Sequence, residues 1–169
     1  MQFPTTGACG ILLPMTTNVH YGSYETIPDS ASEGLLFLKS FLPVLDSLDA
    51  SPPIDPYVFN TTQFVLNRDA PITVEKLSEM HQMRHRMLQV FRHDVTRAWE
   101  IERAGGITVI FESESTTQFK GDDVQVKVAE MNTWELKRVS WGRLRLTEAR
   151  CWMDPSAVQN RANEFFGNK

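Results

Sequence analysis

The first half of the chain places apolar residues with the period of a helix. Four leucines recur at intervals of three and four residues, as on the apolar face of an amphipathic helix: Leu35, Leu38, Leu42 and Leu45. Asp29, Ser30 and Ser32 precede this run and are candidate N-caps. Pro43 lies within the run, so we expect it to kink the helix or to divide it in two.

A second helix is predicted after a proline-rich break. Residues 51–56 end helical structure, and Tyr57 to Leu66 should form a short extended segment. The next helix should begin near Pro71, with Thr73 as its N-cap and Glu75 in its first turn, where the helix dipole favours an acid. Its apolar face is formed by Leu77, Met80, Met87 and Phe91.

From Arg92 onward the apolar period changes to two, which is typical of strands. Strand-like runs follow one another, separated by short turns: Arg92 to Ile101, Ile107 to Phe119, Val124 to Leu136 and Leu144 to Met153. Such runs form an antiparallel meander. Helices followed by a meander predict an α+β fold, in which the helices pack on one face of a curved antiparallel sheet.

Length and composition indicate one soluble domain. The chain has 169 residues, of which 41% are hydrophobic and 22% charged. We expect an N-terminal arm (1–28), a single domain (29–160) and a C-terminal tail (161–169). The arm should pack on the domain or on a partner subunit. It has no basic start followed by a long apolar run, so neither a signal peptide nor a membrane span is expected.

Charge and cysteine usage narrow the function further. The net charge is −4 and the basic residues are scattered, which argues against nucleic-acid binding. Cys9 and Cys151 are too few for a disulfide framework or a structural zinc site, as expected of a reduced, cytoplasmic protein. A small organic molecule is the expected ligand.

Ionisable residues continue the apolar faces of the last two predicted strands. The third strand carries Glu130, Asn132 and Trp134 in register with its valines. The last strand carries Glu148, Arg150, Trp152 and Asp154 in register with its leucines. Because side chains two residues apart point the same way, these groups should face the helices, or water beyond the edge of the sheet. A carboxylate in an apolar interior must be paired or protonated, and either state suits acid–base catalysis.

Four residues are predicted to be catalytic: Asp154, Glu130, His93 and Arg97. Asp154 ends the last strand before Pro155 and would transfer a proton, unless it only caps a turn. His93 shares a predicted face with Arg97 and would be the acid–base partner, unless it is a hydrogen-bonded structural residue. Arg97 would hold negative charge that develops on the substrate.

Further residues are predicted to bind the substrate: Trp99, Glu112, Asn132, Trp134, Glu148, Arg150 and Trp152. The tryptophans would form flat apolar walls, although they suit a filled core equally well. The charged residues could instead form structural ion pairs between neighbouring strands.

Metal and cofactor sites are not expected. His81 and His85 have the helical spacing of metal ligands, but the segment lacks the glutamate of the zinc-protease motif, and Arg84 and Arg86 would repel a cation. We therefore interpret the histidines as exposed or helix-packing residues, and the basic stretch of Arg84, Arg86 and Arg92 as a solvated face. The sequence contains no phosphate-binding glycine loop, dinucleotide fingerprint or nucleophile elbow.

The layout resembles the nuclear-transport-factor-2-like superfamily, in particular its SnoaL-like branch. The resemblance covers about Ser32 to Val158, and rests on the helical first half, the run 93–99, and a glycine turn leading to a last strand that ends in Trp152-Met153-Asp154. It implies a cone-shaped α+β barrel with a pocket between the helices and the concave sheet, often in a homodimer built on the outer face.

The resemblance also implies a class of chemistry. SnoaL-like members include cofactor-independent cyclases, isomerases, dehydratases and epoxide hydrolases of polyketide and terpenoid pathways. In the polyketide cyclases a late aspartate is the general acid and base, and Asp154 best matches it. The histidine pair of the related scytalone dehydratases is not reproduced, since His81 and His85 lie on the helix. Two hypotheses follow: an enzyme of secondary metabolism that cyclises, isomerises or hydrolyses a small molecule, or a non-catalytic ligand-binding or protein-interaction module.

Overall fold

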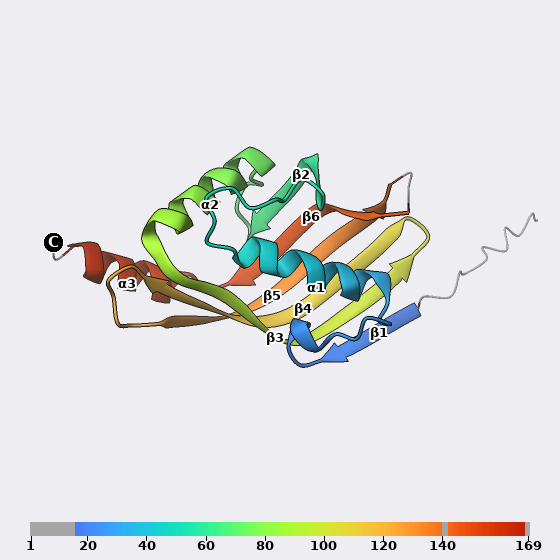
Figure 1. Cartoon of the computed structure of the whole chain (residues 1–169), viewed down its shortest axis with the longest axis horizontal. Helices are drawn as coiled ribbons and strands as arrows, with labels where there is room; N and C mark the ends of the chain where they lie inside the picture. The colour runs from blue at the N-terminus through green and yellow to red at the C-terminus, as the bar shows by residue number, and fades with distance from the viewer. Residues whose placement is uncertain (1–15, 140–141, 168–169) are drawn as a thin grey trace, which may run out of the picture.

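The computed structural model describes residues 16–139 and 142–167, which form a curved sheet with helices on one face (Figure 1). The helices are the short 3-10 helix Tyr24–Thr26 (η1), α1 (Glu33–Asp46), α2 (Val74–Met87) and α3 (Ser156–Gly167). The strands are β1 (Thr16–Tyr21), β2 (Val58–Leu66), β3 (Leu88–Arg103), β4 (Gly106–Phe119), β5 (Val126–Arg138) and β6 (Leu144–Met153). Within these two ranges no helix combines the length and the apolar character needed to cross a membrane.

The predicted meander is present and forms the centre of the sheet. The strand order is β1-β3-β4-β5-β6-β2. β3 to β6 are antiparallel throughout, and β1 pairs antiparallel with the free edge of β3. β2 pairs in parallel with β6 at the other edge. α1 and α2 cover the concave face (Figure 1), so the α+β prediction is confirmed.

Three parts of the chain differ from the sequence prediction. α2 ends at Met87 and β3 begins directly at Leu88, so Phe91 lies in the sheet rather than on the helix. The reason is tertiary, because Leu88 pairs with Phe119 of β4 and its backbone is already extended. β1 lies within the expected arm, and α3 continues through the expected tail as far as Gly167.

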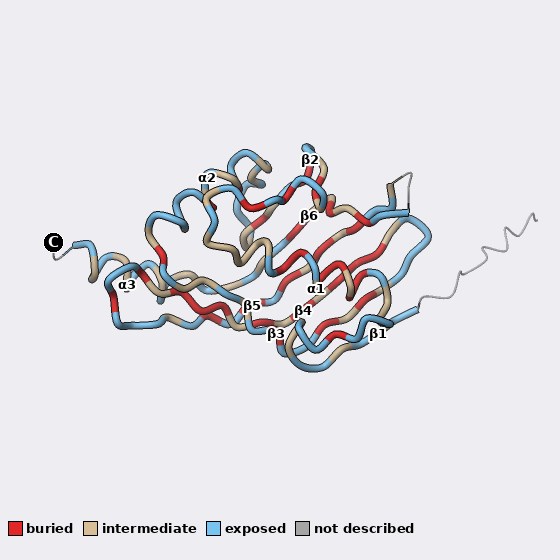
Figure 2. The backbone as a smooth tube through the Cα atoms, in the orientation of Figure 1, coloured by how far each residue is buried: buried red, intermediate tan, exposed pale blue. Residues whose placement is uncertain are grey.

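Aromatic side chains fill the space between α1 and the sheet. Phe41 of α1 is fully buried, with its ring centre 4.7 Å from that of Tyr57 and 5.4 Å from that of Trp134. Phe37 and Phe111 contact the same Trp134 ring edge-on. Figure 2 shows buried residues gathered along α1 and the centres of the strands beneath it. This part of the cone is a packed core rather than a cavity.

The N-terminus of α1 is capped from the sheet. Glu100 of β3 accepts hydrogen bonds from the backbone N–H groups of Gly34 at 2.7 Å and Leu35 at 3.1 Å. Ser32 occupies the N-cap position, but its side chain makes no capping hydrogen bond. The helix is not divided at Pro43. Glu100 therefore fixes the start of α1 on the sheet, where it satisfies donors that the helix cannot use itself.

Gly34→Ala is expected to destabilise the protein by about 1–3 kcal/mol, because there is no room for a methyl group. The added Cβ would lie 2.7 Å from Oε2 of Glu100 and within 2.9 Å of the side chains of Ile107 and Val109. Denaturant unfolding measures the change. Gly105→Ala is the matched control, since its Cβ would meet no atom within 4 Å. Equal effects at the two glycines would contradict the close approach of α1.

Register shifts interrupt the pairing of β2, β3 and β6, and two of these shifts change which residues face the interior. The pairing of β3 with β4 skips one residue at Thr96, and the pairing of β6 with β5 skips one residue at Thr147. Beyond a bulge the alternation of inner and outer side chains is shifted by one residue. The two halves of each strand thus present different sets of residues to the interior.

Candidate active site

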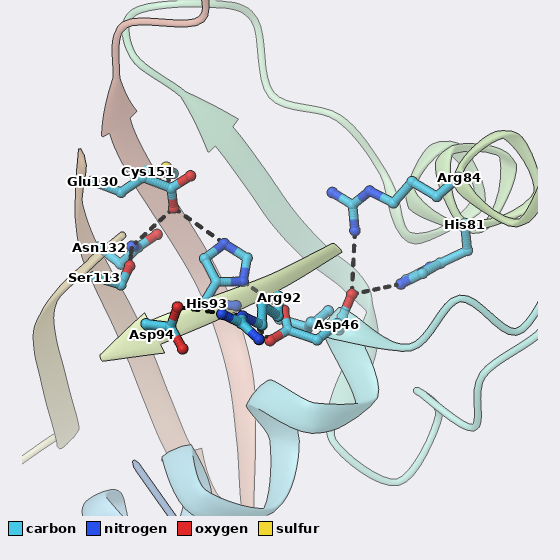
Figure 3. Close-up of polar contacts among 11 residues, drawn as sticks. Asp46, His81, Arg84, Arg92, His93, Asp94, Ser113, Glu130, Asn132 and Cys151 are labelled. Atoms are coloured by element: carbon cyan, nitrogen blue, oxygen red, sulfur yellow. Dashed lines mark hydrogen bonds and ion pairs between the residues drawn. The ribbon is translucent and has the colours of Figure 1, made fainter. Parts of the chain in front are cut away.

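A largely buried histidine lies between two carboxylates on the concave side of the sheet (Figure 3). Nδ1 of His93 is 2.5 Å from Oδ1 of Asp46, and Nε2 is 3.1 Å from Oε2 of Glu130. The backbone N–H of His93 also donates to Oδ2 of Asp46 at 2.8 Å. The side chain of His93 keeps 15% of its surface exposed, and that of Glu130 only 4%. We call these three residues the histidine cluster.

Each member of the histidine cluster comes from a different element. Asp46 is the last residue of α1, His93 precedes the bulge of β3, and Glu130 lies near the start of β5. An acid at a helix C-terminus is unfavourable because the dipole places partial negative charge there, and no basic residue lies in the last turn of α1. The contact with His93 offsets this cost.

Burial and hydrogen bonding act in opposite directions on the histidine cluster. Burial alone would lower the pKa of His93, but the hydrogen bonds to Asp46 and Glu130, with their charges, outweigh it and raise the pKa to about 9. Burial alone would raise the pKa of Glu130, but the contact with His93 outweighs it and lowers that pKa. At neutral pH an imidazolium therefore lies beside an ionised carboxylate.

Polar side chains from three strands surround Glu130. Nδ2 of Asn132 donates to the hydroxyl of Ser113 at 3.2 Å and lies 3.5 Å from Oε2 of Glu130. The Cys151 thiol donates to the same oxygen at 3.7 Å. Burial raises the pKa of this thiol well above its ordinary range, so it stays protonated. Cys9, the other cysteine, lies outside the described residues.

α2 forms a second wall beside the histidine cluster. The guanidinium carbon of Arg84 is 4.0 Å from the ring centre of Phe91, whose ring is perpendicular to that of His93 at 5.3 Å between ring centres. Arg84 donates to the backbone carbonyl of Leu45 at 3.2 Å, and the ring of His81 lies 3.4 Å from the same oxygen. His81 is fully buried, as a helix-packing residue should be, and burial lowers its pKa.

The arrangement provides a proton donor and a proton acceptor side by side. At neutral pH the imidazolium of His93 can give a proton and the carboxylate of Glu130 can take one. Asp46 bonds both Nδ1 and the backbone N–H of His93, which fixes the direction of Nε2. Across residues 16–139 and 142–167, no three His, Cys, Asp or Glu side chains are grouped as a metal site would require.

The structure brings together part of the predicted site. His93, Glu130 and Asn132 lie in one buried group. Trp134 also faces inward, but it belongs to the packed aromatic core.

The bulge at Thr96 turns the rest of the predicted face of β3 outward. Arg97 is exposed, and its guanidinium lies over the rings of Tyr21 and Trp99 at 5.3 Å in each case. Glu112 pairs with Arg97 in the register of β3 and β4 and shares this outer face. The expectation that Arg97, Trp99 and Glu112 line the site with His93 is therefore wrong.

The bulge at Thr147 does the same to β6. Arg150 pairs with Glu148 on the surface, and Trp152 is 41% exposed. The exposed carboxylate of Asp154 accepts hydrogen bonds from the backbone N–H and the hydroxyl of Ser156, at the start of α3. These four residues do not face the interior as predicted, and Asp154 takes the capping position that was its alternative.

Two residues of the site escaped sequence analysis. Asp46 lies on a helix, whereas the predicted site residues lie along the strands, but its unfavourable place at a helix C-terminus is a usable signal. Arg84 was expected on a solvated face, but it is half-buried beside Phe91, and this desolvation lowers its pKa. Its neighbours in sequence, His85 and Arg86, are exposed, so the sequence of this segment does not show that Arg84 alone turns toward the interior.

A surface groove of about 420 Å³ lies near the N-terminal end of α1, away from the histidine cluster. Its walls include Glu33, Phe37, Tyr57 and Arg143. Since Asp46 is at the opposite end of α1, this groove does not reach His93.

Comparison with known proteins identifies the fold. No protein-family model matches the sequence, and no curated protein is similar to it. A conserved protein from Planctomyces limnophilus superposes with a TM-score of 0.64 at 8% identity, over 72% of this chain and 94% of that one. A candidate scytalone dehydratase from Novosphingobium aromaticivorans gives a TM-score of 0.61 at 6% identity, over 72% of this chain and 82% of that one.

A third solved structure carries the family name. It is a candidate dehydratase of the NTF2-like family from Streptomyces avermitilis, with a TM-score of 0.58 at 9% identity, over 71% of this chain and 92% of that one. The neighbours also include proteins described as ketosteroid isomerase-like and SnoaL-like. The chain therefore has the nuclear-transport-factor-2-like fold, as the resemblance implied.

Proposed function

We propose that this chain is a cofactor-independent enzyme that transfers protons on a small organic molecule, in a cyclisation or isomerisation of polyketide type. One observation carries the proposal: an imidazolium and a carboxylate, His93 and Glu130, lie 3.1 Å apart in a buried position. Such a pair combines a general acid and a general base without a metal or a cofactor. Neighbours named as dehydratases and as a polyketide cyclase support the substrate class.

The residues take distinct roles in this proposal. The substrate replaces the direct contact between His93 and Glu130. Glu130 removes a proton from one atom, and His93 delivers a proton from Nε2 to another. Asp46 does not touch the substrate and is a positioning residue, because it holds the imidazole by Nδ1 and the backbone N–H. The buried surroundings strengthen each of these interactions.

A non-catalytic ligand-binding or protein-interaction module is the second candidate function. The observation that favours it is the filled space beneath α1, where Phe41 and Trp134 pack without a gap for a large ligand. In such a module the histidine cluster would serve only to hold α1 on the sheet.

Exchange of α-protons of β-tetralone in D2O, followed by NMR, separates the two functions. The wild-type protein is expected to accelerate the exchange, and Glu130→Gln should reduce it to the buffer rate because the base is lost. Asp154→Asn is the matched control and should keep the wild-type rate, since Asp154 is exposed at the cap of α3 and asparagine caps equally well. No acceleration by the wild-type protein would favour the module. Full activity of Glu130→Gln would remove Glu130 from the mechanism.

A further inference from the structure

The guanidinium of Arg84 is a half-buried cation with most of its hydrogen-bonding capacity unused. A guanidinium has five N–H donors. In the part of the chain that the structure describes, one of them is bonded, to the carbonyl of Leu45 at 3.2 Å. The ring of Phe91 covers one face of the guanidinium at 4.0 Å. The N–H donors lie in the plane of the group, so the unused ones point outward from its edge. The guanidinium nitrogens of Arg84 that lack a partner keep solvent-accessible surface, so an incoming ligand can reach them.

Arg84 faces the histidine cluster. The charges of Asp46 and Glu130 both act on its guanidinium and raise its pKa, against the larger effect of burial. Figure 3 shows Arg84 extending from α2 toward the end of α1, on the side where His93 lies. Phe91 connects the two, since its face meets Arg84 and its ring packs at a right angle to that of His93.

The other arginines near this part of the sequence cannot replace Arg84. Arg92 is exposed and pairs with Asp94 at 3.3 Å. Arg97 lies on the outer face of the sheet over Trp99. The sequence predicts Arg97 as the cation beside the reacting groups. In the structure Arg84 is the arginine that lies there.

The charges of this region balance. Asp46 and Glu130 supply two negative charges, and protonated His93 and Arg84 supply two positive ones. A ligand with a permanent carboxylate would leave one negative charge uncompensated in a buried site, which is unfavourable. A neutral ligand would leave the balance intact.

We propose that Arg84 binds the carbonyl oxygen of a neutral molecule and stabilises the negative charge that forms on it. The inference rests on the proposed function. When Glu130 takes the proton from the carbon next to the carbonyl, the C–H electron pair forms a C=C bond and the carbonyl π pair moves onto oxygen. Glu130 becomes neutral as the oxygen becomes negative, so the total charge of the site does not change. The N–H donors of the Arg84 guanidinium are already in place to form hydrogen bonds to the negative oxygen.

Binding of para-nitrophenolate to the Glu130→Gln protein tests this inference without turnover. The phenolate carries its charge on one oxygen, as an enolate does, and Glu130→Gln reproduces the neutral state of Glu130. Affinity is measured from the absorbance of the probe. Adding Arg84→Gln should weaken binding by at least about tenfold, as expected for the loss of a hydrogen bond to a charged group. Uncharged nitrobenzene should bind equally with and without Arg84.

Arg86→Gln in the same background is the matched control. Arg86 lies on the same helix but is exposed and donates to the backbone of Gln82, so its loss should leave phenolate affinity unchanged. Equal affinity with and without Arg84, an equal loss at Arg86, or no binding to Glu130→Gln would overturn the inference. If Arg84→Gln does not fold, Arg84→Lys keeps the charge but lacks the planar set of guanidinium donors. It should still lower the phenolate affinity by at least about threefold, and an unchanged affinity would overturn the inference. Failure of the β-tetralone exchange alone would reject the proposed function and leave the Arg84 site standing.

Discussion

Raising the pH from 6.5 to 9 is expected to lower the unfolding free energy of the wild-type protein by about 3 kcal/mol. The pKa of His93 is 6.5 in its ordinary state and about 9 in the folded protein, so protonation favours folding. This stability is fully present below pH 6.5 and is lost as the pH rises through about 9. Urea unfolding at several pH values across this window measures it.

His93→Asn should remove this dependence and lower the stability at neutral pH by about 3 kcal/mol, since two buried carboxylates then lose their cation. His85→Asn is the matched control, because the His85 side chain is exposed on α2 and its Nδ1 contacts the backbone carbonyl of Leu48 rather than a carboxylate. It should keep the wild-type slope. His81 acts in the opposite sense and at lower pH, since its pKa is lowered by burial. A wild-type stability that does not change between neutral pH and pH 9 would show that His93 is not held as an imidazolium.

Phe41→Ala is expected to destabilise the protein by about 3–5 kcal/mol. The side chain is fully buried, and its removal would leave a cavity bounded by the rings of Phe37, Tyr57 and Trp134. These rings come from α1, from the turn before β2 and from β5, and they cannot all move inward to close it. Denaturant unfolding gives the free-energy change.

Phe166→Ala deletes the same atoms from a ring that is 43% exposed, near the end of α3. It should cost about 1 kcal/mol or less. A loss below about 1 kcal/mol for Phe41→Ala would mean that α1 packs loosely on the sheet, and would favour an open cavity beneath it.

Local signals in the sequence predicted the elements well where the chain itself decides the conformation. Thr73 caps α2 as expected, with its hydroxyl accepting from the N–H of Lys76 at 3.3 Å. The glycine turns separate β3, β4, β5 and β6 close to the predicted places. The end of α2 was misplaced because the apolar spacing through Phe91 fits a helix, whereas pairing with β4 makes this segment a strand.

The site was predicted less well, for two physical reasons. Inner and outer positions were assigned by strict alternation, which holds for Glu130 and Asn132 on the regular strand β5. It fails after Thr96 and Thr147, and an extra residue in one strand is set by the register of its neighbour, which the strand's own sequence does not show. Asp46 and Arg84 reach the site through helix placement, which depends on contacts such as the one between Glu100 and Gly34.

Because Thr147 is an extra residue in β6, a change in the length of this strand alters which side chains face the interior. A substitution changes one side chain and leaves the others on their faces. Removing that single codon would restore strict alternation, so Cys151 and its inward neighbours would exchange sides with Glu148 and Arg150. Insertions and deletions of one amino acid in this strand are therefore a direct evolutionary route to a new cavity lining on an unchanged scaffold.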